Sequence, residues 1–193
     1  MIVNDNQKDI TLINRIRNGE KSAYKELINR HKDYAFTVAY RILNSREDAE
    51  EVAQDAFMQV FGALNAFNAE SKFTTWFYRI VFNAALMQKR KKRILTDDID
   101  ASSEAFMMSN SNNSDEDLQK KERRKAIEKA LQNLSADDVT MITLFYLKEQ
   151  SLEEIAEITQ ISAETAKVKI HRARKRLAEE MKKMLKEEVK SLL

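Results

Sequence analysis

The chain has only two glycines and no proline in 193 residues. Tight hairpins and phosphate-binding loops depend on these two residue types for their backbone conformations. Both kinds of structure are therefore disfavoured, and we expect an almost entirely helical protein. With 43% apolar residues the chain can fill a hydrophobic core, and its length allows one ordinary domain or two small ones.

Features of secretion and of membrane insertion are missing from the sequence. The chain contains no cysteine, which excludes disulfides and thiolate zinc sites. The first residues, MIVNDNQKDI, lack the basic region and apolar run of a signal peptide. No apolar stretch approaches the roughly 18 residues that a membrane span needs. We therefore expect a cytoplasmic protein without membrane insertion.

Charge divides the chain into three parts. Residues 96–118 contain seven Asp and Glu residues and no Lys or Arg, and they are rich in Ser and Asn without helical periodicity. This composition predicts an acidic, flexible linker. The flanking parts each carry more Lys and Arg than Asp and Glu. We therefore expect an all-α fold of two small helical domains, residues 1–95 and 119–193, on either side of the linker.

Apolar periodicity predicts four helices in the first domain. The first two span about 8–18 and about 20–43, and the next two begin after Ser45 and Ser71, which are suitable caps. On the third helix the expected buried face comprises Val52, Ala56, Phe57, Val60, Phe61 and Leu64. On the fourth helix it comprises Phe73, Phe77, Ile80, Ala84 and Met87.

Serines mark the helix starts in the second half of the chain. Ser114, Ser135 and Ser151 each precede a periodic run and have Asp or Glu three residues later, the pattern of a capping box. Ser162 begins the last helix. Only TQI, residues 159–161, lies between the run that follows Ser151 and this last helix, so the chain must turn sharply there. The spacing predicts a helix-turn-helix.

The predicted last helix has an apolar face and a basic face. Ala166, Ile170, Ala173 and Leu177 recur at steps of four, three and four, and would pack on the preceding helix. The opposite face fits the DNA major groove, where arginine reads guanine and other cations neutralise phosphates. A merely solvated face is the alternative, but the short turn favours DNA binding. The candidate duplex contacts are Ser162, Thr165, Lys167, Val168, His171, Arg172 and Lys175.

A second basic run, KRKKR at residues 89–93, closes the predicted fourth helix. One or two cations would complement the helix dipole, so five indicate a further role. Aromatic side chains beside cations form a platform for the unstacked bases of single-stranded DNA. Aromatics at helical spacing are more often core residues, and for Trp76 that alternative stays open. The candidate contacts of a melted strand are Thr75, Trp76, Tyr78, Arg79, Asn83, Lys89 and Arg90.

Three stretches carry a family resemblance, namely SREDAEEVAQDAFMQVFGAL, FTTWFYRIVFNAALMQKRKKR and LEEIAEITQISAETAKVKIHRARKRL. Together they resemble a bacterial RNA polymerase sigma factor of the extracytoplasmic-function (ECF) type, the first two in its region 2 and the third in its region 4. The most specific pieces are Asp48-Ala49 with Gln54 and Phe57, the string Trp76 to Ile80 with Asn83, and Thr165 followed by His171-Arg172-Ala173-Arg174.

The resemblance implies a subunit that binds core RNA polymerase and promoter DNA, that is no enzyme and that needs no cofactor. The third helix would dock on the polymerase clamp. The fourth helix and the NAFNAES loop, residues 65–71, would open the minus-ten element and hold it as a single strand, and the last helix would read the minus-thirty-five element as a duplex. An anti-sigma factor is a further implied partner. The implied clamp contacts are Asp48, Glu51, Gln54 and Asp55.

Two positions depart from the family pattern. Ser135 stands where the family usually has proline, and Gln160 stands in the turn where it usually has glycine. Serine can still cap a helix. We expect Gln160 to adopt a positive φ at a cost of about 1 kcal/mol.

Two other function classes fit a helical chain less well. An enzyme with a carboxylate-bridged metal site would use Glu-x-x-His pairs, but Ile28 and Val168 stand three residues before His31 and His171. No metal site is expected, and His31 should be a packed or half-exposed helical residue. The nearer alternative is a stand-alone helix-turn-helix regulator whose first half senses a ligand or dimerises. Such a regulator would bind its operator alone, whereas a sigma factor would need core polymerase to open a promoter.

Overall fold

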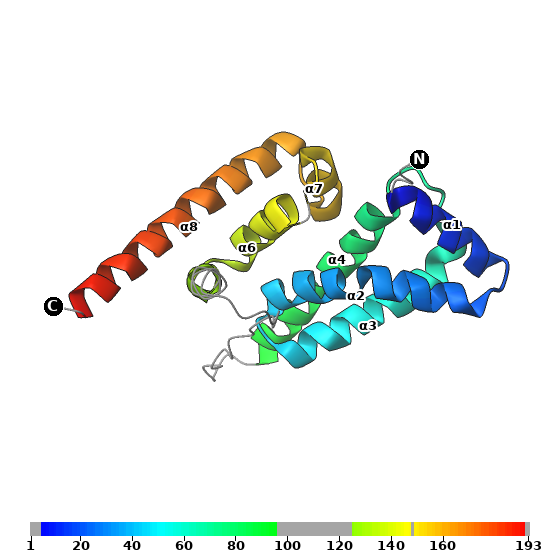
Figure 1. Ribbon diagram of the computed structural model, residues 1–193, viewed down its shortest axis with the longest axis horizontal. Coiled ribbons are helices and arrows are strands. Elements are labelled where there is room, and N and C mark those ends of the chain that lie inside the picture. Colours follow the sequence, from blue (N-terminus) through cyan, green and yellow to red (C-terminus); the bar gives the residue numbers. More distant parts are fainter. Residues whose placement is uncertain (1–4, 96–124, 148, 192–193) are drawn as a thin grey trace, which may run out of the picture.

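The computed structural model describes residues 5–95, 125–147 and 149–191 of the chain (Figure 1). All regular structure in these residues is helical, which confirms the expected all-α fold. The predicted linker, residues 96–118, and the predicted cap Ser114 lie outside the described residues.

Four helices make up the first half of the fold, α1 (Asp5–Arg17), α2 (Lys21–Leu43), α3 (Arg46–Ala63) and α4 (Phe73–Leu95). Helix α2 packs along both α3 and α4, which also contact each other, and α1 packs on α2 (Figure 1). Aromatic rings fill the centre, where the ring centroids of Phe57 and Phe77 are 4.7 Å apart. The face predicted for α3 is confirmed, since its members are buried except for the half-buried Phe61.

The buried face of α4 differs in part from the prediction. Phe73 and Phe77 are fully buried as expected, but Ile80 and Ala84 are only half-buried and Met87 is 67% exposed. The buried side chains beyond Phe77 are Tyr78, Val81, Phe82 and Ala85. The buried surface is rotated and widened because α4 packs not only on α2 and α3 but also on a helix from the second half of the chain.

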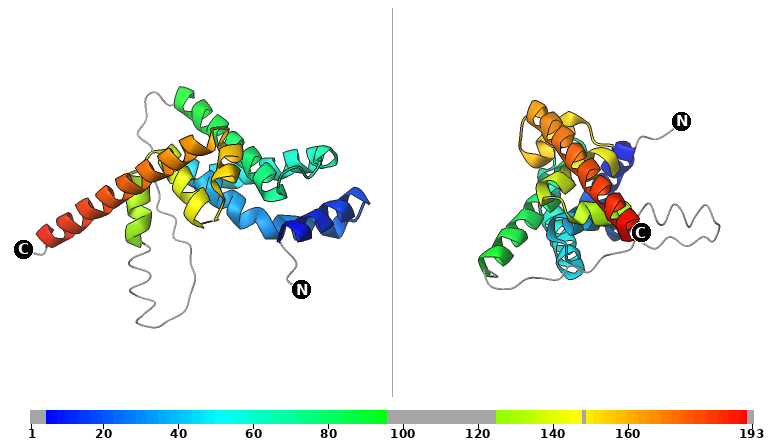
Figure 2. Two further views of the ribbon diagram at one scale, coloured as in Figure 1. Left: turned by 90° about the horizontal axis from the view of Figure 1, so that it is seen from above. Right: turned by 90° about the vertical axis from the view of Figure 1, so that its left-hand side faces the viewer.

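The second half contains a helical segment at residues 125–132, α6 (Ala136–Ile142), a π-helical turn η2 (Thr143–Leu147), α7 (Leu152–Thr159) and α8 (Ala163–Ser191). Helices α7 and α8 form the predicted helix-turn-helix, and both α6 and α7 pack on α8. The predicted stripe of α8 is confirmed, with Ala166, Ile170 and Ala173 buried and Leu177 half-buried. Figure 2 shows the C-terminal part of α8 projecting beyond the other helices.

Serine caps explain why the helices start where they do. The hydroxyl groups of Ser45, Ser135 and Ser151 accept hydrogen bonds from the amides three residues later, at 3.4, 3.2 and 3.2 Å. Ser151 completes a capping box, because its own amide donates to Glu154 at 2.8 Å. At the other end of α7, Gln160 has φ +56° and closes the turn in the left-handed conformation, as its position predicted.

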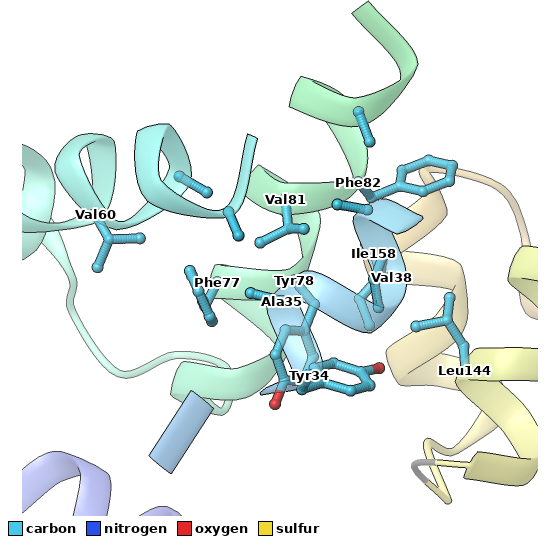
Figure 3. Close-up of a cluster of buried hydrophobic side chains, with 14 of the residues drawn as sticks. Tyr34, Ala35, Val38, Val60, Phe77, Tyr78, Val81, Phe82, Leu144 and Ile158 are labelled. Atoms are coloured by element: carbon cyan, nitrogen blue, oxygen red, sulfur yellow. The ribbon is translucent and has the colours of Figure 1, made fainter. Parts of the chain in front are cut away.

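The two halves pack directly against each other. Helix α7 lies on α4, and α6 lies on α2. Figure 3 shows Leu144 of η2 and Ile158 of α7 reaching the same cluster as Val38 of α2 and Phe82 of α4. All four side chains are buried, so one continuous hydrophobic core spans both halves.

Ion pairs border this shared core. Lys72, next to the start of α4, lies 2.7 Å from a carboxylate oxygen of Glu154 on α7. Arg41 of α2 makes a two-pronged ion pair with Glu128, and its side chain is only 10% exposed. The contact between the halves is thus apolar in its centre and charged at its margin.

Candidate nucleic-acid interface

Helix α8 presents the residues predicted to contact duplex DNA on its solvent side. Ser162 caps the helix by accepting a hydrogen bond from the amide of Thr165 at 3.1 Å. The first turn of a helix carries a partial positive charge and unpaired amides, which suit a phosphate. All of the predicted duplex contacts are exposed, namely Ser162, Thr165, Lys167, Val168, His171, Arg172 and Lys175.

Some cations of α8 are used within the protein and others are not. Arg176 donates to both carboxylate oxygens of Asp138 at 2.8 and 2.6 Å, and Lys169 lies 3.2 Å from Asp137. These two pairs tie α8 to the start of α6. Among the carboxylates of the described residues, none forms an ion pair with Lys167, Arg172 or Lys175. The basic face of α8 can therefore bind an external anion without first breaking a described ion pair.

Two of the α4 residues predicted to hold a melted strand are inside the protein. Thr75 is 1% exposed and Tyr78 is 5% exposed. The Tyr78 ring packs against Tyr34 with centroids 3.6 Å apart, and its hydroxyl lies 3.4 Å from Nδ1 of His31. Burial raises the pKa of Tyr78, so the phenol is neutral at physiological pH. In this arrangement neither Thr75 nor Tyr78 can touch DNA.

Trp76 and Arg79 on α4 are partly accessible to solvent. Trp76 is half-buried and packs on Phe67 with ring centroids 5.0 Å apart. Arg79 is half-buried, and its guanidinium lies 4.0 Å from the carboxylate of Glu157 on α7. An acidic helix thus occupies the position in front of Arg79 where a phosphate could sit.

The remaining predicted contacts on α4 differ in whether another group of the protein already binds their side chains. Asn83, Lys89 and Arg90 are all exposed. The Nζ of Lys89 donates to the carbonyl oxygen of Ile42 at the end of α2, at 2.9 Å, and burial lowers the pKa of Lys89. Arg90 is therefore the better placed of the two cations for a DNA phosphate, because Lys89 already serves the C-terminus of α2.

Among the predicted clamp contacts on α3, one is buried and the others are exposed. Asp48 is 7% exposed, and its carboxylate accepts a hydrogen bond from Lys92 of α4. Burial is the largest single influence and would raise the pKa of Asp48. The hydrogen bonds from Lys92, Ser45 and Gln88 and the charge of Lys92 together outweigh it and hold the pKa below the usual 3.8. Asp48 thus joins α3 to α4 and is not presented to a partner. The exposed members of the set are Glu51, Gln54 and Asp55.

Met58 is a surface residue that the sequence did not single out. It is 72% exposed and lies one to two turns after Glu51 and Gln54 on the same face of α3. A large apolar side chain amid polar ones is typical of the centre of a protein interface. Its exposure could have been predicted from the sequence, because Met58 lies opposite the stripe of Val52, Ala56 and Val60.

The ion pair of Asp48 gives a testable prediction. Replacing Asp48 with asparagine should lower the free energy of unfolding by about 1 kcal/mol at neutral pH, because the amide oxygen can still accept a hydrogen bond from Lys92 but the attraction between opposite charges is lost. The pKa of Asp48 is depressed in the folded state, so its stabilisation is present above the usual value of 3.8 and is lost as the pH falls through the folded-state value. Urea denaturation at neutral pH and at about pH 3 should show the difference shrinking in acid. The exposed Glu51→Gln variant is the control, and an equal loss there would contradict the assignment.

His31 is a packed core residue, as expected. Its Nε2 lies 3.0 Å from the carboxylate of Asp9, which is fully buried and also accepts a hydrogen bond from Arg30 at 2.8 Å. His31 thereby links α1, α2 and α4 through Asp9 and Tyr78. The cluster pairs buried polar groups in the centre of the first half through Oδ1 of Asp9, while Oδ2 of Asp9 has no hydrogen-bond partner among the described residues, and its role is structural.

Comparison with known proteins identifies the family. Residues 27–94 match the profile of Sigma-70 region 2, and residues 124–177 match that of Sigma-70 region 4. The chain is 30% identical over 177 residues to the ECF RNA polymerase sigma factor SigW of Bacillus subtilis, a match that covers 88% of this chain and 95% of the relative. The chain belongs to the ECF sigma factors. Sigma factors are transcription initiation factors rather than enzymes.

Other ECF and related sigma factors match over most of their length. The RNA polymerase sigma-H factor of Pseudomonas aeruginosa is 27% identical, with 94% of this chain and 97% of the relative covered. Among solved structures, the sigma factor RpoE in complex with the anti-sigma factor NepR from Bartonella quintana is 25% identical, with a TM-score of 0.69 over 82% of this chain and 96% of that one. In the described part of this ECF sigma factor, no helix combines the length and apolar character needed to cross a membrane.

Proposed function

We propose that the protein binds core RNA polymerase and directs it to promoters, where it recognises the minus-thirty-five element as a duplex and holds the minus-ten element as a single strand. The observation that carries this proposal is the exposed cationic face of α8 within a helix-turn-helix. Such a helix fits the major groove, and its free cations can bind bases and phosphates. The aromatic and basic residues of α4 supply the second kind of surface, which suits unpaired bases. Membership of the ECF family supports both assignments.

Run-off transcription tests the proposal directly. Purified core RNA polymerase and a set of genomic promoter fragments are incubated with and without the protein. We expect specific transcripts only when the protein and core polymerase are both present. A stand-alone helix-turn-helix regulator would instead bind its site without polymerase and yield no polymerase-dependent opening. Specific binding of the protein alone, with no new transcript in the complete mixture, would contradict the proposal.

The exposed face of α3 is the proposed contact with polymerase. Glu51, Gln54 and Asp55 give it an acidic and polar rim, and Met58 gives it an apolar centre. An acidic rim around an apolar residue is complementary to a basic surface with an apolar depression. We also propose an anti-sigma partner, because the similar sigma factor RpoE of Bartonella quintana was solved in complex with the anti-sigma factor NepR.

The packing of α7 on α4 affects how a melted strand could bind. Thr75 and Tyr78 are buried, and Glu157 of α7 stands in front of Arg79. A strand that reached Arg79 would have to displace Glu157 and so move α7, which would also break the pair of Lys72 with Glu154. We therefore propose that the two halves separate when the protein acts on a promoter.

A reversible cross-link between the halves should switch off promoter opening. The chain has no natural cysteine, so Lys72→Cys with Glu154→Cys gives one defined pair across α4 and α7. Joining the two thiols with a bismaleimide that contains a reducible bond should reduce run-off transcription to background, and reduction should restore it to the level of the unlinked variant. Arg15→Cys with Glu26→Cys, which lie in ion-pair contact within the first half, is the matched control. Full activity of the linked α4–α7 variant would contradict the proposed separation.

A further inference from the structure

The loop between α3 and α4 is held in one defined shape. After the short 3-10 helix η1 (Leu64–Ala66), Phe67 turns inward, is only 6% exposed and packs on the rings of Phe73 and Trp76 at 5.9 and 5.0 Å. Ala69 has φ +60°, a left-handed conformation that costs a residue with a Cβ atom about 1 kcal/mol. A loop that keeps a strained residue is held by its surroundings.

Arg17 secures the beginning of this loop. Its Nη2 atom donates to the carbonyl oxygen of Leu64 at 2.8 Å and also to that of Phe67. The carbonyl oxygen of Leu64 also accepts the amide of Phe67 at 3.3 Å, so Arg17 adds a second, charged donor there and supplies a donor to the carbonyl of Phe67 just beyond the end of η1. Arg17 is the final residue of α1, and its two acceptors lie 47 and 50 residues further along the chain.

Asn6 secures the other end of the loop. Its side-chain oxygen accepts a hydrogen bond from the amide of Phe73, the first residue of α4, at 3.3 Å. The sequence predicted Ser71 as the cap of α4, whereas the structure supplies this contact from α1. Helix α1 therefore contacts both ends of the loop, through Arg17 near its start and Asn6 near its finish. Helix α1 also lies before residues 27–94, which match region 2.

The outer side of the loop is open and polar. Asn68 bends the loop, with its side-chain oxygen accepting a hydrogen bond from the amide of Glu70 at 3.3 Å. Asn65 and Asn68 are both exposed, and an amide side chain offers two donors and an acceptor to the edge of a base. The half-buried ring of Trp76 lies directly behind Phe67. The loop is thus a small pre-arranged polar surface beside an aromatic platform.

We propose that Arg17 is a positioning residue, which holds the loop of residues 64–72 in the shape that binds bases of the single-stranded minus-ten element, with Asn6 fixing the other end. This inference rests on the proposed function. A comparison with Arg15 supports it, because Arg15 is bound by the carboxylates of Glu20 and Glu26, as expected for an arginine that only joins helices. Arg17 instead donates to two backbone carbonyls of the loop.

The test measures binding of the holoenzyme to the single-stranded non-template strand of the minus-ten region, taken from a promoter that gives a run-off transcript. A panel of oligonucleotides with single-base changes gives a ranking of affinities. Arg17→Ala should weaken binding to the best oligonucleotide about tenfold and flatten the ranking, because charge-assisted hydrogen bonds to the loop are lost. Arg17→Lys should recover part of both effects, since an ammonium group can still donate to a carbonyl. Binding of a duplex minus-thirty-five fragment should not change.

Arg15→Ala is the matched control, because it removes an arginine from the same helix without touching the loop, and its ranking should equal that of the wild type. Asn6→Ala, which changes no charge, should flatten the ranking at the same positions and keeps the test informative if Arg17→Ala fails to fold. An unchanged ranking in both loop variants would overturn the inference. Uniform weakening of every oligonucleotide with a smaller salt dependence would show that Arg17 is a phosphate contact, which also overturns it. Failure of wild-type holoenzyme to bind any of the oligonucleotides would count against the proposed function instead.

Discussion

Reversing the charge of Glu51 and Asp55 together should lower the affinity of the protein for core RNA polymerase by about 100-fold or more. Both side chains are exposed on α3, around the exposed Met58. Their partner surface must be basic if the proposed docking is correct, and facing like charges cost several kcal/mol across an interface. The Glu51→Lys, Asp55→Lys double variant should therefore fail to co-purify with core polymerase from a mixture in which the wild type does.

The control for this experiment must change the net charge equally. Asp33→Lys with Glu179→Lys also reverses two exposed carboxylates, one on α2 and one on α8, and should co-purify as the wild type does. Circular dichroism should give the same helicity and midpoint for both variants, because surface substitutions away from partners change stability by about 0.5 kcal/mol or less. Loss of polymerase binding in the control as well would assign the effect to overall charge. Retained binding in both would remove α3 from the interface.

Local signals in the sequence were enough to predict the helix-turn-helix. The hydroxyl caps at Ser135 and Ser151 and the left-handed turn at Gln160 depend on residues within one turn of each other, and the structure has all three. The buried stripe of α8 followed from helical periodicity, which also fixes which side chains face solvent. Periodicity does not predict the pairing of Arg176 on the same helix with Asp138 of α6.

The burial of predicted contacts on α3 and α4 could not be predicted in this way. Periodicity assigns a helix one buried face, but α4 packs on α7 as well as on α2 and α3, and Phe82 of α4 is buried in one cluster with Ile158 of α7. A single sequence contains no local signal that a helix some 80 residues away packs there. Asp48 shows the same limit, since the family resemblance implied a contact with polymerase, whereas Asp48 is buried and its carboxylate accepts a hydrogen bond from Lys92 of α4.

The contacts of α1 with the loop of residues 64–72 also escape a local pattern. Arg15 and Arg17 look alike in the sequence, yet one joins α1 to α2 and the other supports a distant loop. The caps of α4 make the same point, because Ser71 was the natural local choice and Asn6 makes the contact from 67 residues earlier. Tertiary contacts decide such roles, and propensity predicts only which residue types are able to fill them.

Arg172→Ala and Lys175→Ala should weaken promoter binding in different ways. Both side chains are exposed on α8 and have no ion-pair partner among the described carboxylates. A recognition helix presents base edges to its N-terminal residues, and Lys175 lies nearly one turn further from the helix start than Arg172. Arg172→Ala should therefore cost about 1–3 kcal/mol at one or two positions of the minus-thirty-five element and relax the preference there. Lys175→Ala should weaken all sequences alike.

Holoenzyme binding to a panel of single-base promoter variants at several salt concentrations separates these effects. A lost phosphate contact lowers the slope of log affinity against log salt by about 0.9, so Lys175→Ala should show a smaller slope and an unchanged ranking. Arg172→Ala should reorder the variants at the positions it reads. Lys169→Ala is the control, because Lys169 is paired with Asp137 of α6 and should change neither quantity. The opposite outcome, in which Arg172→Ala leaves the ranking unchanged and Lys175→Ala reorders it, would contradict this assignment. Arg172, which lies nearer the start of the helix, would then face the DNA backbone, and α8 would enter the groove in the opposite direction to the one proposed.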